Sequence, residues 1–135
     1  MSGERGSQAT ILVVEDEPWT RRVIAQHLEE AGYRVLQATN GFSGLILVLR
    51  ERPDVIILDL ILPELLGSQL LDELRGRAET RAIPIIGISA SPASAAEGQL
   101  WTGRLRKPFP LERLLLLVAQ VLRGAASDGA GVATG

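Results

Sequence analysis

The length, composition and charge of the chain fit one globular domain and exclude several kinds of site. The chain has 135 residues and a mass of 14.5 kDa, the usual size of a single domain, and its net charge is −2, whereas nucleic-acid-binding surfaces normally need a basic excess. It has no cysteine and one histidine, His27, which excludes disulfides, thiolate catalysis and His-cluster metal sites. No apolar run approaches the ~20 residues that span a bilayer, and no secretory signal is visible, so we expect a cytoplasmic protein with no direct membrane or nucleic-acid contact.

Hydrophobic periodicity predicts five strands that alternate with helices. Strands are expected over residues 10–15, 34–38, 54–60, 83–89 and 105–107, and helices over 18–31, 42–51, 67–77 and 110–123. The segment 91–103 contains Pro, Ser and Gly and predicts at most a short turn of helix. Apolar strands of this kind are typical of a parallel sheet covered by helices on both faces. We expect a flexible N-terminus over 1–9, one domain over 10–123, and a Gly/Ala-rich tail or linker stub over 124–135.

Polar side chains stand where the predicted strands end. The first strand ends in Glu15 and Asp16, the third in Asp59, the fourth in Ser89, and the fifth in Lys107, which is the only lysine beside thirteen arginines. Parallel strands deliver their carboxyl ends to one edge of the sheet, where ligands bind. Two carboxylates ~4 Å apart repel by about 4 kcal/mol at an effective dielectric of 20, so this cluster needs a cation, and Mg²⁺ suits carboxylates and water. A lysine and a hydroxyl suit phosphate oxygens, and an aspartate can attack phosphorus to form an acyl phosphate.

Four motifs make the chain resemble the receiver domain of bacterial two-component response regulators over about residues 10–123. They are ILVVEDEP at 11–18, PDVIILDLILPELLG at 53–67, IPIIGISAS at 83–91 and RKPF at 106–109. The resemblance implies a flavodoxin-like, doubly wound five-stranded parallel sheet of order 2-1-3-4-5, with a shortened fourth helix region. It also implies a single-domain phosphoacceptor module that is not a multiple-turnover enzyme on a separate substrate. Its phosphoryl group would come from a histidine kinase or phosphotransfer protein, and its output would pass to a downstream protein target.

The resemblance also implies roles for individual residues. Asp59 corresponds to the phosphoacceptor, and the implied Mg²⁺ ligands are Asp16, Asp59, Glu15 (mainly through water) and the backbone carbonyl of Ile61. Ser89 corresponds to the hydroxyl that turns towards the phosphoryl group. Lys107 corresponds to the lysine that pairs with the phosphoryl oxygens, and it precedes Pro108 in a peptide that is commonly cis.

The chain departs from the family pattern in its switch region and its last helix. The position three residues before the lysine is usually aromatic but is Arg104 here, and Trp101 is a candidate for the moving ring. Leu116, Leu117 and Ala119 stand where receivers usually carry charge, which predicts a homodimer or partner contact through the last helix. The alternative is that the shortened region leaves this face to be covered within the monomer.

Other interpretations remain open. One is a receiver-fold interaction scaffold that is not phosphorylated or is atypically switched. A phosphatase of the haloacid dehalogenase type would need a second Asp where Ile61 stands, and a nucleotide binder would need a Gly-rich or Ser/Thr-rich phosphate loop after the first strand. Glu17 is interpreted as an acid that favours the helix dipole, and Arg21 and Arg22 as a solvated face.

Overall fold

The computed structural model describes residues 8–60, 67–90 and 102–126. Five strands alternate with helices in the predicted order, although no helix is described between the last two strands. The elements are β1 (Thr10–Val14), α2 (Pro18–Glu30), β2 (Arg34–Ala38), α3 (Gly41–Glu51), β3 (Val55–Asp59), α4 (Gly67–Arg75), β4 (Ile85–Ser89), β5 (Gly103–Arg106) and α5 (Leu111–Ala126).

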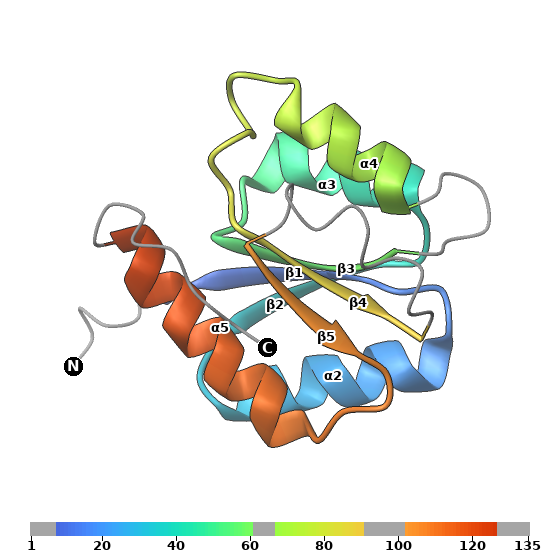
Figure 1. Ribbon diagram of the computed structural model, residues 1–135, viewed down its shortest axis with the longest axis vertical. Helices are drawn as coiled ribbons and strands as arrows, with labels where there is room; N and C mark the ends of the chain where they lie inside the picture. The colour runs from blue at the N-terminus through green and yellow to red at the C-terminus, as the bar shows by residue number, and fades with distance from the viewer. Residues whose placement is uncertain (1–7, 61–66, 91–101, 127–135) are drawn as a thin grey trace.

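The strands form one parallel sheet in the order β2-β1-β3-β4-β5. Figure 1 shows α3 and α4 on one face of this sheet and α2 and α5 on the other. The order reverses between β1 and β3, and Val14 pairs with Leu58 there. The predicted flavodoxin-like fold and strand order are therefore confirmed, and the reversal point lies where ligands bind in open α/β sheets.

Alternation along the buried strands divides the core into two layers. In β1, Ile11 and Val13 pack with the layer under α2 and α5, whereas Leu12 and Val14 pack with the layer under α3 and α4. The same alternation runs through the four apolar residues of β3, and its last residue, Asp59, is also buried. A strand buried on both faces is a nearly continuous apolar run, so a polar side chain in it is expected where the strand ends, at the edge of the sheet.

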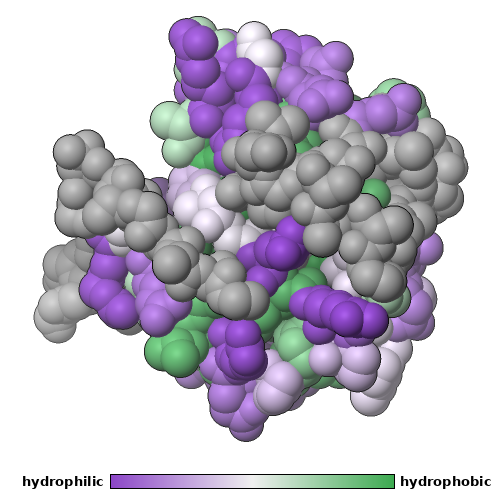
Figure 2. Space-filling model, in the orientation of Figure 1, coloured by the Kyte–Doolittle hydropathy of each residue, from purple (hydrophilic) through white to green (hydrophobic). Residues whose placement is uncertain are grey.

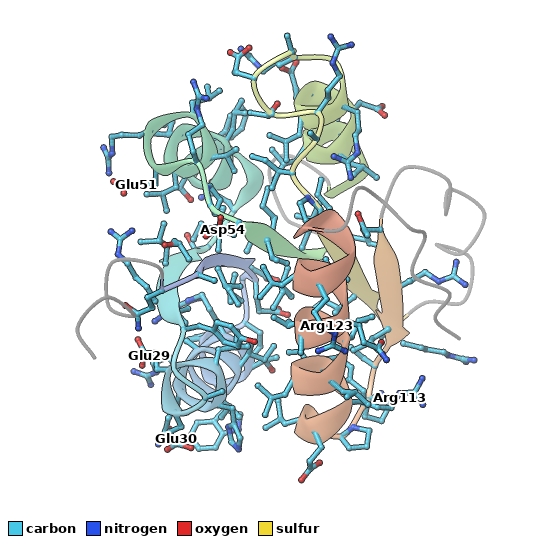
Figure 3. All side chains as sticks on the ribbon, turned by 90° about the vertical axis from the view of Figure 1, so that its left-hand side faces the viewer. Glu29, Glu30, Glu51, Asp54, Arg113 and Arg123 are labelled. Atoms are coloured by element: carbon cyan, nitrogen blue, oxygen red, sulfur yellow. The ribbon has the colours of Figure 1, made fainter. Side chains whose placement is uncertain are left out.

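Element boundaries are set by capping groups and by prolines. Glu17 caps α2 by accepting a hydrogen bond from the backbone N–H of Thr20 at 2.7 Å, and Asp54 accepts one from the N–H of Thr10 at 2.8 Å. Asp54 lies at the amino-terminal end of β3, on the side of the molecule that Figure 3 shows. Strand β4 begins at Ile85, two residues later than predicted, because Pro84 has no N–H to donate to a neighbouring strand.

The last helix requires one correction. Leu117 was expected at an interface, but it is 4% exposed and belongs to the core. A Cβ atom at Gly103 would lie 3.2 Å from Leu117 Cδ1, so the glycine at the start of β5 allows the helix to approach closely. Leu116 is 58% exposed and Ala119 is partly buried.

Two expectations fall mostly outside the described residues: the shortened fourth helix region, largely within 91–101, and the flexible termini. The helix expected over 110–123 instead continues to Ala126 and so includes the first three residues of the expected tail. Within the described residues, no helix combines the length and the hydrophobicity needed to cross a membrane.

Candidate functional site

Three carboxylates from two neighbouring strands meet at the carboxyl edge of the sheet, which lies to the right in Figure 1. Glu15 and Asp16 follow β1 directly, and Asp59 is the last residue of β3. One oxygen from each lies within 4.8 Å of the others. Glu15 and Asp59 are buried, whereas Asp16 is exposed. The juxtaposition predicted from the strand ends is therefore present.

Lys107 supplies the positive charge of this cluster. Its Nζ donates hydrogen bonds to Glu15 Oε1 at 2.8 Å and to Asp59 Oδ2 at 3.3 Å. Its backbone N–H donates to the carbonyl of Ser89 at 2.8 Å, which fixes the lysine to the end of β4. The Lys107–Pro108 peptide is cis, as the resemblance implies. The ammonium group therefore bridges the ends of β1 and β3.

Glu15 is the most enclosed of the three acids, with 1% of its surface exposed. While Oε1 accepts from Lys107, Oε2 accepts from the backbone N–H of Glu17 at 3.1 Å. Both oxygens therefore have a protein donor, which agrees with a residue that would hold an ion through water more than by direct ligation.

The pKa values reflect a site with more negative than positive charge. Burial raises the pKa of Glu15 above its ordinary value, and the Asp59 charge adds to this, although the hydrogen bond from Lys107 opposes it. Burial alone would lower the pKa of Lys107, but its hydrogen bonds and charge interactions with Glu15 and Asp59 outweigh burial and raise it. Lys107 is therefore a permanent cation at neutral pH.

The donor set fits a small hard cation. Mg²⁺ is a hard cation that prefers oxygen ligands and keeps several of its own waters when it is bound by proteins. The site offers three carboxylate oxygens within 4.8 Å of one another, and the exposed Asp16 leaves a side open to water. The described residues therefore have the oxygen donors and the negative charge that would hold a divalent cation, which would offset the repulsion among the carboxylates.

Of the remaining predicted site residues, two are described by the structure and two are not. Ser89 is buried at the end of β4, one residue beyond the partner of Asp59 in the sheet register. Arg104 is partly buried on β5 and pairs with Gly87. Ile61 and Trp101 lie outside the described residues, so their roles remain predictions.

Arg21 was interpreted from the sequence as part of a solvated face, but the structure places it beside the site. Arg21 is partly buried, and its Nη1 donates to the backbone carbonyl of Glu15 at 2.9 Å. A hydrogen bond to a main-chain carbonyl leaves no pattern in the sequence, because any residue at position 15 offers the same acceptor.

Comparison with known proteins gives a consistent result. The family model described as "Response regulator receiver domain" matches residues 11–119. Protein PilH of Pseudomonas aeruginosa is 36% identical over 122 residues, which cover 86% of this chain and 99% of PilH. The chain spans only about half the length of several other curated relatives, which are described as transcriptional regulators.

Solved structures show the same similarity. Chemotaxis response regulator CheY4 of Vibrio cholerae has a TM-score of 0.79 and 32% identity, covering 84% of this chain and 98% of that chain. The receiver domain of sensor histidine kinase PA1611 from Pseudomonas aeruginosa has a TM-score of 0.79 and 29% identity, covering 86% and 98%. Its structure contains a magnesium ion coordinated in the active site cleft.

Proposed function

The chain belongs to the response regulator receiver domain family and is a phosphoacceptor signalling module, and we propose that Asp59 is the residue that accepts the phosphoryl group. The observation that carries this proposal is the position of Asp59 between two further carboxylates and the ammonium of Lys107. A carboxylate can attack phosphorus directly, and Lys107 provides the fixed charge that its product requires.

The chemistry is an in-line displacement on a phosphohistidine. An oxygen of Asp59 attacks phosphorus, the bond between phosphorus and the imidazole nitrogen breaks, and the electron pair leaves with the imidazole. Mg²⁺, held by Asp16, Asp59 and, through water, Glu15, would neutralise charge that develops on the phosphoryl oxygens. Lys107 is already at the acceptor, so its charge needs little reorientation to act on the same oxygens.

Phosphorylation changes the partners of Lys107. In the unmodified site, the ammonium group donates hydrogen bonds to both Glu15 and Asp59. A phosphoryl group adds ~1.5–2 negative charges at neutral pH and three acceptor oxygens. Lys107 then pairs with the phosphoryl oxygens, and Ser89 donates its hydroxyl to them. Because the backbone of Lys107 is bonded to Ser89, this exchange is transmitted to the ends of β4 and β5.

The donor is a histidine kinase or a phosphotransfer protein, and the output is a protein contact. A homodimer through α5 is one such contact. Figure 2 shows hydrophobic surface in the region of α5, and Leu116 is exposed there. Sedimentation of the phosphorylated and unphosphorylated chain tests this contact, and a monomer at high concentration in both states would exclude the homodimer.

An atypically switched receiver is a second candidate, and Arg104 is the observation that favours it. An arginine on β5 cannot reproduce the inward movement of a neutral aromatic ring, because its charge must keep a polar partner. The phosphorylation chemistry would then be retained while its readout differed. Replacing Arg104 with Tyr tests this: a change in target binding with unchanged phosphorylation supports the second candidate.

The experiment that tests the proposal is phosphorylation by acetyl phosphate with Mg²⁺, followed by intact mass. We expect an adduct of about 80 Da, one phosphoryl group, in the parent chain. Chelation of Mg²⁺ or the Asp59→Asn substitution should remove it. Absence of any adduct, with a histidine kinase as well, would favour a non-phosphorylated scaffold.

A further inference from the structure

Arg21 joins the first turn of α2 to the ends of two strands. Its Nη1 donates to the carbonyl of Glu15 at 2.9 Å, and its Nε donates to Gln37 Oε1, on β2, at 3.2 Å. Its backbone N–H donates to the carbonyl of Glu17 at 3.0 Å, which is the first hydrogen bond of the helix. Three points of attachment therefore meet on one residue.

The Glu15 carbonyl stands just beyond the sheet ladder. The backbone N–H of Glu15 still bonds to the carbonyl of Ala38 at 3.0 Å, but the regular pairing of β1 with β2 ends one residue earlier, at Val14. A buried carbonyl without a donor is costly, and the guanidinium of Arg21 supplies the donor. Arg21 thus closes a short loop from Glu15 to Arg21, and that loop contains Asp16.

Asp16 depends on this loop for its position. Its carboxylate is exposed, and no hydrogen bond to it is found within the described residues, so no side-chain hydrogen bond fixes its position. Its direction is set by the backbone on either side, which is fixed by the bonds of Glu15 and by the N–H of Glu17 on Glu15 Oε2. Outer groups that orient metal ligands typically change metal affinity 10–100-fold when they are removed.

From this geometry we infer that Arg21 is a positioning residue for the divalent-cation site, acting on Asp16 through the carbonyl of Glu15. The inference rests on the proposed function for the identity of the cation. It makes a prediction opposite in sign to simple electrostatics. Removing a positive charge near a cation site should strengthen cation binding, whereas loss of a positioning bond should weaken it.

The test is titration of the full chain with Mg²⁺ alone, followed by calorimetry, with no phosphoryl donor present. We expect Arg21→Ala to bind Mg²⁺ about tenfold more weakly than Arg22→Ala, at the lower end of the effect of outer groups on metal sites. Arg22 is exposed and adjacent, so its substitution removes the same charge without the bonds described above. Arg21→Lys keeps the charge but cannot reach both acceptors as a fork, and we expect an intermediate affinity.

A second readout separates positioning from a general effect on folding. At saturating Mg²⁺, phosphorylation of Arg21→Ala by acetyl phosphate should approach the parent rate, with only the Mg²⁺ concentration at half-saturation shifted. If Arg21→Ala unfolds, Arg21→Lys carries the test against the parent chain, which has the same charge. Mg²⁺ binding by folded Arg21→Ala that equals or exceeds that of Arg22→Ala, or binding by Arg21→Lys that equals or exceeds that of the parent chain, would overturn the inference. Weaker Mg²⁺ binding in a chain that no donor phosphorylates would instead uphold the inference and overturn the proposed function.

Discussion

Removing the charge of Asp59 should stabilise the metal-free protein. At an effective dielectric of 20, the attraction of Asp59 to Lys107 at 3.3 Å is worth about 5 kcal/mol, and its repulsion from Glu15 at the 4.8 Å limit of the cluster about 3.5 kcal/mol. Asp16 adds a further repulsion that solvent reduces, so the interactions of Asp59 with these three charged side chains nearly cancel. The desolvation of a carboxylate that is 7% exposed then decides the sign, because burying a charge costs several kcal/mol. Asp59→Asn retains shape and an acceptor for Lys107, and we expect a gain of about 1–2 kcal/mol.

Urea unfolding with and without Mg²⁺ measures this effect. In chelator, Asp59→Asn should be more stable than the parent, whereas Asp72→Asn, which makes the same charge change on an exposed part of α4, should be within about 0.5 kcal/mol of it. Saturating Mg²⁺ should reverse the order, because a ligand at 100 times its dissociation constant stabilises the parent by about 2.7 kcal/mol. A variant less stable than the parent in chelator would refute the reasoning, since Lys107 would then more than compensate the buried charge.

Three further predictions concern other parts of the molecule. Because the pKa of Glu15 is raised, the native state binds more protons than the unfolded chain between pH 4.5 and the raised pKa, and the parent loses stability as pH rises through this range. In chelator, the stability of Glu15→Gln relative to the parent should therefore increase with pH over this range. A relative stability that decreases with pH would contradict the prediction. Gly44→Ala would place a Cβ atom 3.1 Å from the buried Cγ2 methyl of Val14. Urea unfolding should show a net loss of about 1 kcal/mol in the free energy of unfolding, because the steric cost exceeds the gain in helix propensity. Unchanged stability would show that the neighbouring side chains move aside without cost. Leu117→Asp should lower the free energy of unfolding by more than about 3 kcal/mol, because it buries a charge. Leu116→Asp should change the free energy of unfolding by less than about 0.5 kcal/mol and should remove any self-association seen by sedimentation. Similar losses of stability in both variants would place Leu116 in the core.

The fold and the central part of the site could be predicted because both follow from strand order. Parallel strands with short polar ends must bring those ends to one edge, so Asp59 and Lys107, 48 positions apart, could be placed together from the sequence. The apolar runs of β1 and β3 identified central strands because a strand buried on both faces has no polar alternation.

Contacts that depend on packing or on main-chain atoms could not be predicted in the same way. Leu117 lies at helical spacing from the buried Leu114 and Val121, so periodicity could have placed it on the inner face of α5, but its close contact with Gly103 depends on packing. Arg21 and Arg22 are equally charged neighbours, and only the position of the Glu15 carbonyl separates the bonded arginine from the solvated one. Likewise, the sequence does not reveal that the Lys107 ammonium donates hydrogen bonds to both Glu15 and Asp59, because these bonds depend on distances of a few tenths of an ångström.

The most direct measurement is chemical mapping of the phosphorylated residue. The chain is phosphorylated with acetyl phosphate and Mg²⁺, reduced with borohydride to convert an aspartyl phosphate to homoserine, digested, and sequenced by mass spectrometry. Homoserine should appear at position 59 alone and should be absent without Mg²⁺. Homoserine at Asp16 or Asp54 with Asp59 unmodified would contradict the assignment of Asp59 as the acceptor.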